Sequence, residues 1–353
     1  MSLWETYIRD VEPYVPGEQP GGENIIKLNT NENPYPPAPG VEKALRDMDP
    51  ALFCKYPDPS AGILVEALAD CYRQPRERIF VGVGSDDVLA MAFLTFFNSK
   101  KPVLFPDVTY SFYPVWARLF GIPYETPALD EEFRIKPEDY KRENGGIVFP
   151  NPNAPTGLFL PLSHVEDIVK ANRDSVVIVD EAYIDFGGRS ALPLIDRYPN
   201  LLVVQTFSKS RSMAGMRVGF AVGQEELIRA LGNVKYSYNS YTMNMPSIVL
   251  GTEAVKDEAY FRETRRRIMN TREKAKTKLA RMGFSCTDSM TNFLFITHPK
   301  VKAAELFEAL RQRQIYVRYF QAPRLDSHLR VTVGTDEEME VLYDFLESYL
   351  DRL

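Results

Sequence analysis

The chain has 353 residues, a formal net charge of −6, 44% hydrophobic residues and 25% charged residues. These values are typical of a globular protein long enough for two domains, and they argue against a disordered or fibrous chain. The acidic balance (pI ≈ 5.4) lacks the basic footprint of a protein that binds nucleic acid or an anionic membrane surface, so we expect small molecules as partners.

The first eighty residues predict an arm followed by short helices. Residues Met1–Pro39 are rich in Pro, Gly and Asn, which predicts an extended arm rather than a regular helix. A short helix is expected over Val41–Met48. An irregular loop, Lys55–Pro59, then leads to a helix from about Ala61 to Tyr72.

From Arg78 onward, short apolar runs alternate with helical segments, which predicts an α/β fold with a mainly parallel sheet and helices on both faces. The predicted strands are Ile79–Val83, Pro102–Phe105, Gly146–Phe149, Val176–Val179, Leu201–Val204 and Gly219–Val222. The predicted helices include Asp87–Phe97, Tyr113–Phe120 and Ser163–Asn172. Ligands of such sheets bind at the carboxyl ends of the strands.

After Lys235 the pattern changes to that of a smaller α+β domain. Tyr236–Pro246 is interpreted as a junction, and a basic helical stretch follows with apolar residues at helical spacing from Phe261 to Met282. Its nine Lys and Arg residues fit a solvated helix face better than a nucleic-acid surface. The remaining predicted elements are Asn292–Ile296, Ala303–Arg313, Ile315–Tyr319, Leu329–Val333 and Asp336–Asp351. The predicted division is an arm (1–33), a large domain (34–240) and a small domain (241–353).

Cysteine and histidine usage predicts neither a disulfide framework nor a metal site. The three cysteines are odd in number and widely spaced, which fits a reducing, cytoplasmic location. The three histidines lack the spacing of metal ligands. Met1–Tyr14 carries acidic residues and no long apolar core, so we expect neither a secretory signal nor a membrane anchor.

The segment Thr206–Phe220 follows the predicted strand Leu201–Val204 and carries Lys209. A lysine at this point suits an amine that forms an imine, while Thr206, Ser208 and Arg217 are suited to hold a phosphate. The segment therefore points to pyridoxal phosphate. The alternative is a surface lysine in a polar loop.

Gly82–Asp87 links a predicted strand to a predicted helix. Its glycines allow the backbone to approach a ligand closely, and the free N–H groups at the helix start bind anions. The motif is therefore a candidate phosphate cradle, although many turns of this kind are purely structural. It lacks both a complete GxGxxG and a Walker lysine.

Asp180 stands at the end of a hydrophobic strand, where an ionised carboxylate requires a cation or hydrogen-bond donors. A protonated pyridine nitrogen is such a partner, and its protonation makes the ring an electron sink. Tyr183, three residues later, is placed to reach the phenolic oxygen of that ring. The alternatives are a helix cap for Asp180 and a core aromatic for Tyr183.

Phe149–Gly157 is a loop rich in Pro and Asn that follows another predicted strand. With these four motifs along one sheet, the sequence resembles the fold-type I pyridoxal phosphate enzymes and, within them, the histidinol-phosphate aminotransferases. The resemblance spans the chain from Leu28 to Gly334. Its most specific pieces are Lys55–Asp58, Pro155–Gly157, Asp180 with Tyr183, Ser208–Lys209 with Arg217, and Leu329–Gly334. It implies an aspartate aminotransferase-like fold with a large domain that binds pyridoxal 5'-phosphate.

The resemblance also implies roles for individual residues. Lys209 would form the internal aldimine and then act as base and acid in the 1,3-proton shift, with Asp180 and Tyr183 completing the catalytic set. The cofactor phosphate would be held by Thr206, Ser208 and Arg217, with the backbone around Ser85 and Asp86. Tyr110 would stack on the pyridine ring. Where the family often has an asparagine that contacts the phenolic oxygen, this chain has Ala154, and Asn153 is the expected substitute.

The same resemblance implies a homodimer with shared active sites, since Tyr56 would reach the cofactor phosphate of the neighbouring subunit. Arg330 would bind the anionic group of the substrate, with Arg318 as a second candidate. Asn33 and Tyr35 of the arm would close over the substrate.

The expected reaction is transamination of histidinol phosphate with 2-oxoglutarate, in histidine biosynthesis. A threonine-phosphate decarboxylase or an aromatic amino acid aminotransferase would carry most of the same motifs and remains an alternative. A non-catalytic pyridoxal phosphate regulator is disfavoured because only about thirty residues precede the first motif. A binding protein without this cofactor is the remaining alternative.

Overall fold

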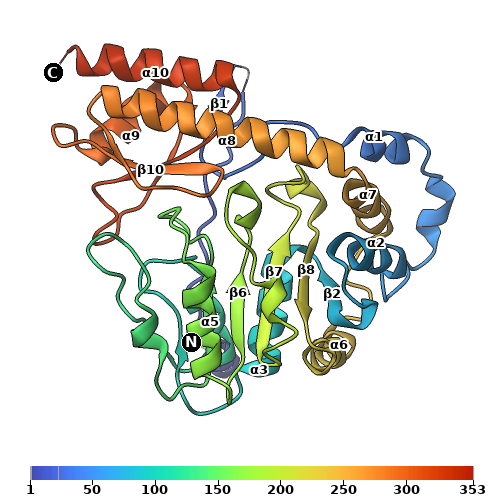
Figure 1. The fold of residues 1–353 in the computed structure, drawn as a ribbon. Coiled ribbons are helices and arrows are strands. Elements are labelled where there is room, and N and C mark those ends of the chain that lie inside the picture. The colour runs from blue at the N-terminus through green and yellow to red at the C-terminus, as the bar shows by residue number, and fades with distance from the viewer. Residues whose placement is uncertain (1, 23, 353) are drawn as a thin grey trace.

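The computed structural model describes residues 2–22 and 24–352, and its centre is a seven-stranded sheet in the order β2-β8-β7-β6-β5-β3-β4 (Figure 1). The strands are β2 (Ile79–Gly82), β3 (Val103–Leu104), β4 (Tyr124–Glu125), β5 (Gly146–Pro150), β6 (Val177–Asp180), β7 (Leu201–Thr206) and β8 (Gly219–Gly223). Neighbouring strands run parallel except at β8, which is antiparallel to both β7 and β2. The mainly parallel sheet is the predicted one.

Helices cover both faces of this sheet, and each face has its own apolar core. Helices α3, α4 and α6 pack on one face through residues such as Phe93 and Trp116, and α2, α5 and α7 pack on the other through residues such as Leu68 and Ile168. The α-helices of this part are α1 (Pro39–Arg46), α2 (Gly62–Tyr72), α3 (Gly84–Phe96), α4 (Phe112–Phe120), α5 (Leu162–Ala171), α6 (Glu225–Tyr238) and α7 (Met245–Lys256). Strands buried on both faces explain why their sequences are continuously apolar.

The C-terminal part builds a second, antiparallel sheet in the order β12-β13-β10-β9. Its strands are β9 (Ser285–Cys286), β10 (Phe293–Thr297), β12 (Arg318–Tyr319) and β13 (Leu329–Thr332). Helices α8 (Glu258–Arg281), α9 (Ala303–Gln312) and α10 (Asp336–Leu350) pack against it through a separate core that includes Leu279, Leu306 and Leu342. None of the helices in the described residues is long and apolar enough to cross a membrane.

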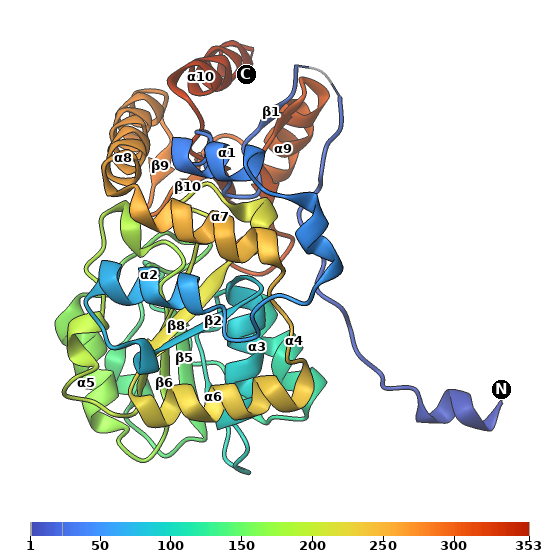
Figure 2. The same ribbon diagram turned by 90° about the vertical axis from the view of Figure 1, so that its right-hand side faces the viewer.

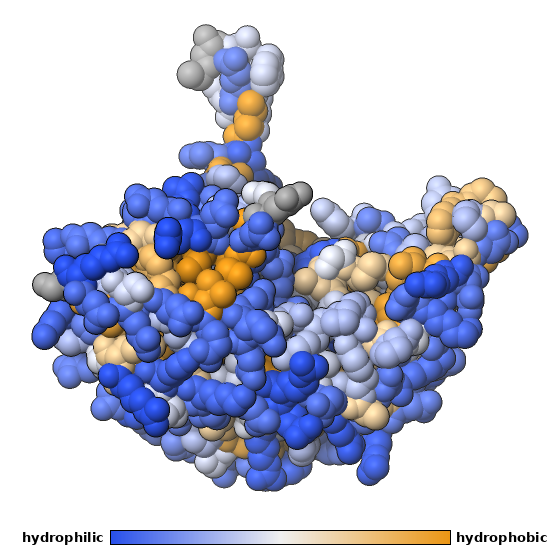
Figure 3. Space-filling model, turned by 90° about the horizontal axis from the view of Figure 1, so that it is seen from above, coloured by the Kyte–Doolittle hydropathy of each residue, from blue (hydrophilic) through white to orange (hydrophobic). Residues whose placement is uncertain are grey.

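The N-terminal arm is extended, as predicted, but it also forms a strand. Its β1 (Ile26–Lys27) pairs in parallel with β11 (Ile315–Tyr316). The short helix η1 (Leu3–Tyr7) stands away from the body of the molecule (Figure 2). Figure 3 shows the same projection beside a mostly hydrophilic surface. The other 3₁₀ helices are η2 (Pro50–Cys54), η3 (Arg76–Arg78), η4 (Pro137–Tyr140), η5 (Ile184–Phe186), η6 (Leu192–Leu194) and η7 (Ala214–Met216).

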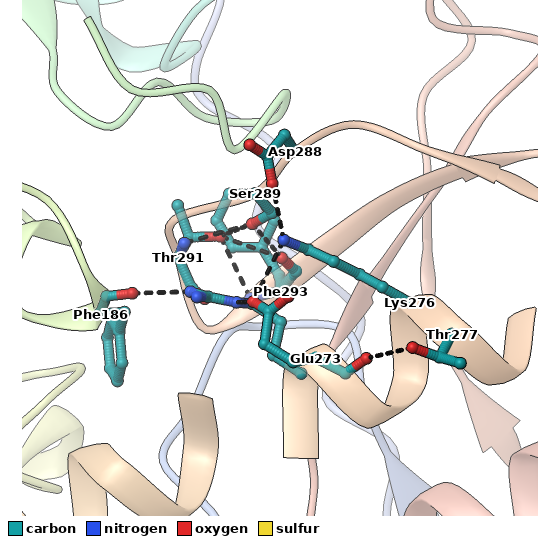
Figure 4. Close-up of polar contacts among 9 residues, drawn as sticks. Phe186, Glu273, Lys276, Thr277, Asp288, Ser289, Thr291 and Phe293 are labelled. Carbon is teal, nitrogen blue, oxygen red and sulfur yellow. Dashed lines mark hydrogen bonds and ion pairs between the residues drawn. The ribbon is translucent and has the colours of Figure 1, made fainter. Parts of the chain in front are cut away.

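Arg272 of α8 ties the C-terminal part to the segment that follows β6. Its guanidinium is buried and donates from Nη1 to the carbonyl oxygens of Phe186 (2.7 Å) and Thr291 (2.9 Å), and from Nε to Glu273 (2.8 Å). Figure 4 shows these partners, with Lys276 bridging between Glu273 and the loop that follows β9. The polar cluster therefore fixes α8 against two loops at once.

Three predicted elements differ from the structure. The helix expected over Asp87–Phe97 begins three residues earlier, because α3 spans Gly84–Phe96. The strand expected over Ile315–Tyr319 is two strands, because β11 pairs with the arm while β12 joins the antiparallel sheet. The junction expected over Tyr236–Pro246 is shorter, because α6 continues to Tyr238 and α7 begins at Met245. The division into an arm and two domains stays a prediction, and its residues Met1, Glu23 and Leu353 lie outside the described residues.

Candidate functional site

Nine of the predicted site residues line one cavity of about 150 Å³ at the carboxyl ends of β6 and β7. They are Ser85, Asp86, Tyr110, Asp180, Tyr183, Thr206, Ser208, Lys209 and Arg217. The parallel strands bring these residues together, because their carboxyl ends meet at the same edge of the sheet. We call this the inner cavity.

Lys209 stands three residues beyond the end of β7, in a loop whose neighbouring side chains are polar. Its Nζ donates a hydrogen bond to the carbonyl oxygen of Thr30 at 3.2 Å and lies 5.7 Å from the centre of the Tyr183 ring. The amine therefore faces the inner cavity between the arm and the segment after β6.

Asp180, the last residue of β6, is a buried carboxyl group at the base of the inner cavity. Burial raises its pKa to about 6, although the Tyr113 hydroxyl (2.8 Å) and the Ala182 N–H (3.1 Å) donate to its two oxygens. In the described part of the chain no Lys, Arg or His forms an ion pair with it. A carboxylate in this setting is stabilised by a cationic ligand group.

The far end of the inner cavity has the character of an anion site. Thr206 and Ser208 present their hydroxyls 3.0 Å apart, and Arg217 Nη1 donates to the Ser208 hydroxyl at 3.3 Å. The N-terminus of α3 brings Ser85 to the same place, and unpaired N–H groups at a helix start attract anions. Asp86 accepts from Arg217 Nη2 at 3.0 Å and from the Tyr110 hydroxyl at 2.7 Å, which orients both side chains.

Two glycines allow this anion site to be so compact. Gly84 has a φ of +83°, and a Cβ there would collide with the Arg217 guanidinium. A Cβ on Gly219, at the start of β8, would collide with the backbone of Gly84 and Ser85. Only glycine permits β8, the α3 turn and Arg217 to pack this closely.

A second, more open cavity of about 430 Å³ adjoins the inner cavity, and Lys209, Tyr110 and Tyr183 line both. Arg330 and Arg318 line this outer cavity from the C-terminal part. Arg330 donates from Nη2 to the Asn29 carbonyl oxygen at 2.8 Å, its Nε is buried without a hydrogen-bond partner, and burial lowers its pKa. An unpaired, buried donor of this kind suits an anionic ligand.

Arg318 is held by the arm. Its two terminal nitrogens donate to the carbonyl oxygens of Pro16 and Val15, each at 3.4 Å. Tyr14, which stacks on Phe112 with ring centres 4.0 Å apart, lines the same cavity. The arm thus forms one wall of the outer cavity.

Four predicted residues do not line either cavity. Asn153 donates to the Val108 carbonyl oxygen (3.0 Å) and to Thr156 (3.1 Å). Because Asn153 lies one residue before the position where the family often has asparagine, its side chain turns into the loop. Ala154, which occupies that position, lines the cavity. The other three are Asn33, which donates to the carbonyl oxygen of Lys209 at 3.0 Å, Tyr35, whose ring lies 4.0 Å from the Arg267 guanidinium, and Tyr56, which is 81% exposed and stacks on Tyr241.

The structure also adds residues that the sequence did not reveal. Tyr113, in the first turn of α4, donates a hydrogen bond to Asp180. Its position three residues after Tyr110 is the sequence signal that could have identified it. Asn31 donates to the Tyr183 hydroxyl at 2.9 Å. Its only sequence signal is its place among the asparagines of the arm, because the contact joins residues far apart in the chain.

The inner cavity fits the chemical groups of pyridoxal phosphate. Thr206, Ser208, Arg217 and the α3 N-terminus suit its phosphate, buried Asp180 suits its protonated ring nitrogen, and Lys209 offers the amine for its aldehyde. Within residues 2–22 and 24–352, no group of three His, Cys, Asp or Glu side chains is arranged to hold a metal ion.

The chain is similar to known proteins over nearly its full length. Residues 23–346 match the family described as aminotransferase class I and II. The chain is 53% identical to histidinol-phosphate aminotransferase 1 of Methylococcus capsulatus, over 98% of this chain and 97% of that protein. It is also 53% identical to histidinol-phosphate aminotransferase 2 of Dechloromonas aromatica, over 98% of each.

A solved structure supports the same relationship. The histidinol-phosphate aminotransferase of Sinorhizobium meliloti, in complex with pyridoxal-5'-phosphate, matches with a TM-score of 0.83 and 25% identity, covering 92% of this chain and 90% of that chain. This likeness confirms the predicted fold class.

Proposed function

This chain belongs to the class I and II aminotransferases, within the histidinol-phosphate aminotransferase family, and from that premise we propose that it transfers the amino group of histidinol phosphate to 2-oxoglutarate. The cofactor is pyridoxal 5'-phosphate. The products are imidazole-acetol phosphate and glutamate, and the reaction serves histidine biosynthesis. We also propose a cytoplasmic location.

The observation that carries this proposal is the composition of the inner cavity. A buried carboxyl, Asp180, lines it and forms no ion pair with a Lys, Arg or His of the described residues, while Lys209 and Arg217 line the same space. An amine, a carboxylate and an anion site are the three groups that pyridoxal phosphate requires of a protein. Their meeting at one sheet edge supports an aminotransferase over a binding protein without this cofactor.

When bound, pyridoxal phosphate supplies an electron sink that makes the hydrogen on the substrate carbon next to nitrogen acidic. Lys209 Nζ would remove that proton and return it to the cofactor side. Asp180 would hold a proton on the ring nitrogen, with Tyr113 orienting the carboxylate from 2.8 Å. Thr206, Ser208 and Arg217 would hold the phosphate.

Arg330 would bind the anionic group of each substrate in turn. Arg330 lines the outer cavity together with Lys209, and its buried Nε has no hydrogen-bond partner. A guanidinium forms two parallel hydrogen bonds with either a carboxylate or a phosphate, so one residue serves glutamate and histidinol phosphate. Arg318 would serve as a second cation, and Asn33 and Tyr35 would hold the arm in place.

We further propose a homodimer in which Tyr56 reaches the cofactor phosphate of the partner chain. In one chain this side chain is 81% exposed. Leu52, Phe53 and Tyr241 are exposed large apolar residues of the same region. An exposed cluster of this kind is typical of a protein interface.

The test compares four amino donors at equal enzyme concentration: histidinol phosphate, phenylalanine, tyrosine and threonine phosphate, each with 2-oxoglutarate. We expect the highest kcat/KM for histidinol phosphate. A higher value for an aromatic amino acid would replace the proposed substrate and leave the aminotransferase chemistry intact. Carbon dioxide released from threonine phosphate without 2-oxoglutarate would instead indicate a decarboxylase.

A further inference from the structure

Tyr183 receives a hydrogen bond that crosses from the arm to the segment after β6. Asn31 Nδ2 donates to the Tyr183 hydroxyl oxygen at 2.9 Å. Asn31 is 1% exposed and Tyr183 is 9% exposed. The amide and the phenol are therefore shielded from solvent, where a hydrogen bond is strong and its direction matters.

Thr332 of β13 sets the orientation of the Asn31 side chain. The Asn31 backbone N–H donates to Thr332 Oγ1 at 2.9 Å, and Thr332 Oγ1 donates its hydrogen to Asn31 Oδ1 at 3.2 Å. Since Oδ1 faces Thr332, the NH₂ group of the amide faces Tyr183.

The backbone of Asn31 is also fixed on both sides. Its N–H is bonded to Thr332, and its carbonyl oxygen accepts from Asn292 Nδ2 at 2.9 Å. Its φ of 56° lies in the left-handed region, which asparagine tolerates better than most residues. The amide is thus held in one place by β13 and by the loop before β10.

This arrangement determines which way the Tyr183 hydroxyl points its own hydrogen. Because its oxygen accepts from Asn31, its hydrogen is free to be donated elsewhere, and Tyr183 lines both cavities. Ala154 lines the same cavities but offers only a methyl group, and Asn153 is turned into its own loop.

We propose that Asn31 and Thr332 are positioning residues that present the Tyr183 hydroxyl as a hydrogen-bond donor to the phenolic oxygen of the bound cofactor. In this chain the pair compensates for the side-chain amide that Ala154 lacks. The inference rests on the proposed function, because it requires pyridoxal phosphate in the inner cavity.

The test follows the visible absorption band of protein reconstituted with pyridoxal phosphate as the pH is varied. A hydrogen bond donated to the phenolic oxygen stabilises its negative charge and lowers the pH at which the band titrates. We expect Asn31→Ala and Thr332→Val to raise that midpoint by about half to one pH unit. Asn31→Asp should raise it too, because a carboxylate accepts the Tyr183 hydrogen, whereas Thr332→Ser should restore the wild-type value.

The controls are two buried polar residues remote from the cavities. Asn200 donates to three backbone carbonyl oxygens near α5, and Thr252 donates within α7. Asn200→Ala and Thr252→Val should lower the melting temperature of the cofactor-free protein and leave the titration midpoint unchanged. A shift of the midpoint in either control would show that loosened packing alone changes the midpoint, and it would overturn the proposal.

The decisive comparison adds Asn31→Ala to a Tyr183→Phe background. We expect no further shift there, because Asn31 acts through the hydroxyl that phenylalanine lacks. An equal shift in both backgrounds, or no shift in the single variant, would overturn the inference while the wild-type band still supports the cofactor. A wild type that develops no band at all would instead overturn the proposed function, and this inference with it.

Discussion

Asp180 makes the stability of the cofactor-free protein depend on pH. Burial raises its pKa to about 6 in the folded chain, against an ordinary value of 3.8. Its contribution to stability is complete below pH 3.8 and is lost as the pH rises through 6, because the folded state disfavours the ionised form. The loss is about 3 kcal/mol for a shift of this size.

The corresponding prediction concerns Asp180→Asn. Urea unfolding of cofactor-free protein at pH 4 and pH 7 should show the wild type losing about 2 kcal/mol more than the variant over this interval, because part of the loss has already occurred by pH 4. In protein reconstituted with pyridoxal phosphate the difference should shrink, because the ring nitrogen supplies a cation. Parallel stability curves for wild type and variant without cofactor would contradict the prediction.

Arg330→Lys tests the anion site of the outer cavity. The Arg330 guanidinium lies 5.4 Å from the centre of the Phe293 ring and 5.6 Å from that of Phe320, and lysine cannot form the paired hydrogen bonds that this planar group forms. We expect KM for both glutamate and histidinol phosphate to rise about 100-fold, a loss of about 2–3 kcal/mol.

Arg318→Lys is the matched comparison for this prediction. Arg318 already donates to the arm at Val15 and Pro16, so its replacement should raise KM by less than about tenfold. Steady-state kinetics with both substrates decides between the two residues. A larger effect at Arg318 would exchange their roles.

Residues at strand ends were predictable from sequence, whereas their supporting partners were not. Asp180 ends β6, Lys209 follows β7 and Arg217 lies just before β8, and the topology of the sheet brings them together. Asn31 gave no such signal, because its contact with Tyr183 depends on how the arm crosses β13. Asn153 was predicted to contact the cofactor, but its side chain points into its own loop. The direction of a loop side chain changes with a shift of one residue, and the sequence does not show that direction.

Helix α8 connects the segment after β6 to the loop before β10 through Arg272. The guanidinium of Arg272 satisfies two backbone carbonyl oxygens, those of Phe186 and Thr291, in a buried setting. Arg272→Met would leave both without a donor, and we expect a loss of about 3 kcal/mol in the free energy of unfolding.

Arg266→Met on the same helix is the control for Arg272→Met. Arg266 is exposed and pairs with Glu263 within one turn, so its replacement should change the free energy of unfolding by less than about 0.5 kcal/mol. Urea denaturation measures both. Similar losses in the two variants would show that helix propensity, not the polar cluster, sets the cost.

The elements themselves were predictable where apolar runs are long and continuous. The strands β5, β6 and β7 are buried on both faces, and their sequences showed it. The sequence of Ile315–Tyr319 predicts one strand because its local pattern is uniform. The division into β11 and β12 arises from two different partners, β1 and β13, which no local pattern encodes.

At the scale of the whole molecule, the proposed homodimer predicts complementation between an inactive variant and a variant with weakened cofactor binding, assayed at limiting cofactor. Lys209→Ala should abolish activity, and Tyr56→Ala should weaken cofactor binding in the partner. A mixed dimer restores one complete site, with Lys209 from one chain and Tyr56 from the other. Unfolding and refolding the two variants together should therefore recover about a quarter of the wild-type activity.

Each variant refolded alone is the control for this complementation. If the mixture is no more active than the sum of its parents, the sites are not shared between chains. Analytical ultracentrifugation of each preparation separates that outcome from a failure to form dimers.

The two glycines that pack around Arg217 have a consequence for how this enzyme could acquire new substrates. A side chain at Gly84 would collide with Arg217, and a side chain at Gly219 would collide with the backbone of Gly84 and Ser85. A single substitution at either position should therefore disrupt the anion site. The wall of the outer cavity that the arm forms lacks this steric constraint, because its residues Tyr14, Pro16 and Gln19 belong to an extended segment. Substitutions in the arm are therefore better tolerated than substitutions at the anion site. Selection of a mutant library for new amino donors should accumulate changes in the arm and leave the residues that hold the cofactor phosphate unchanged.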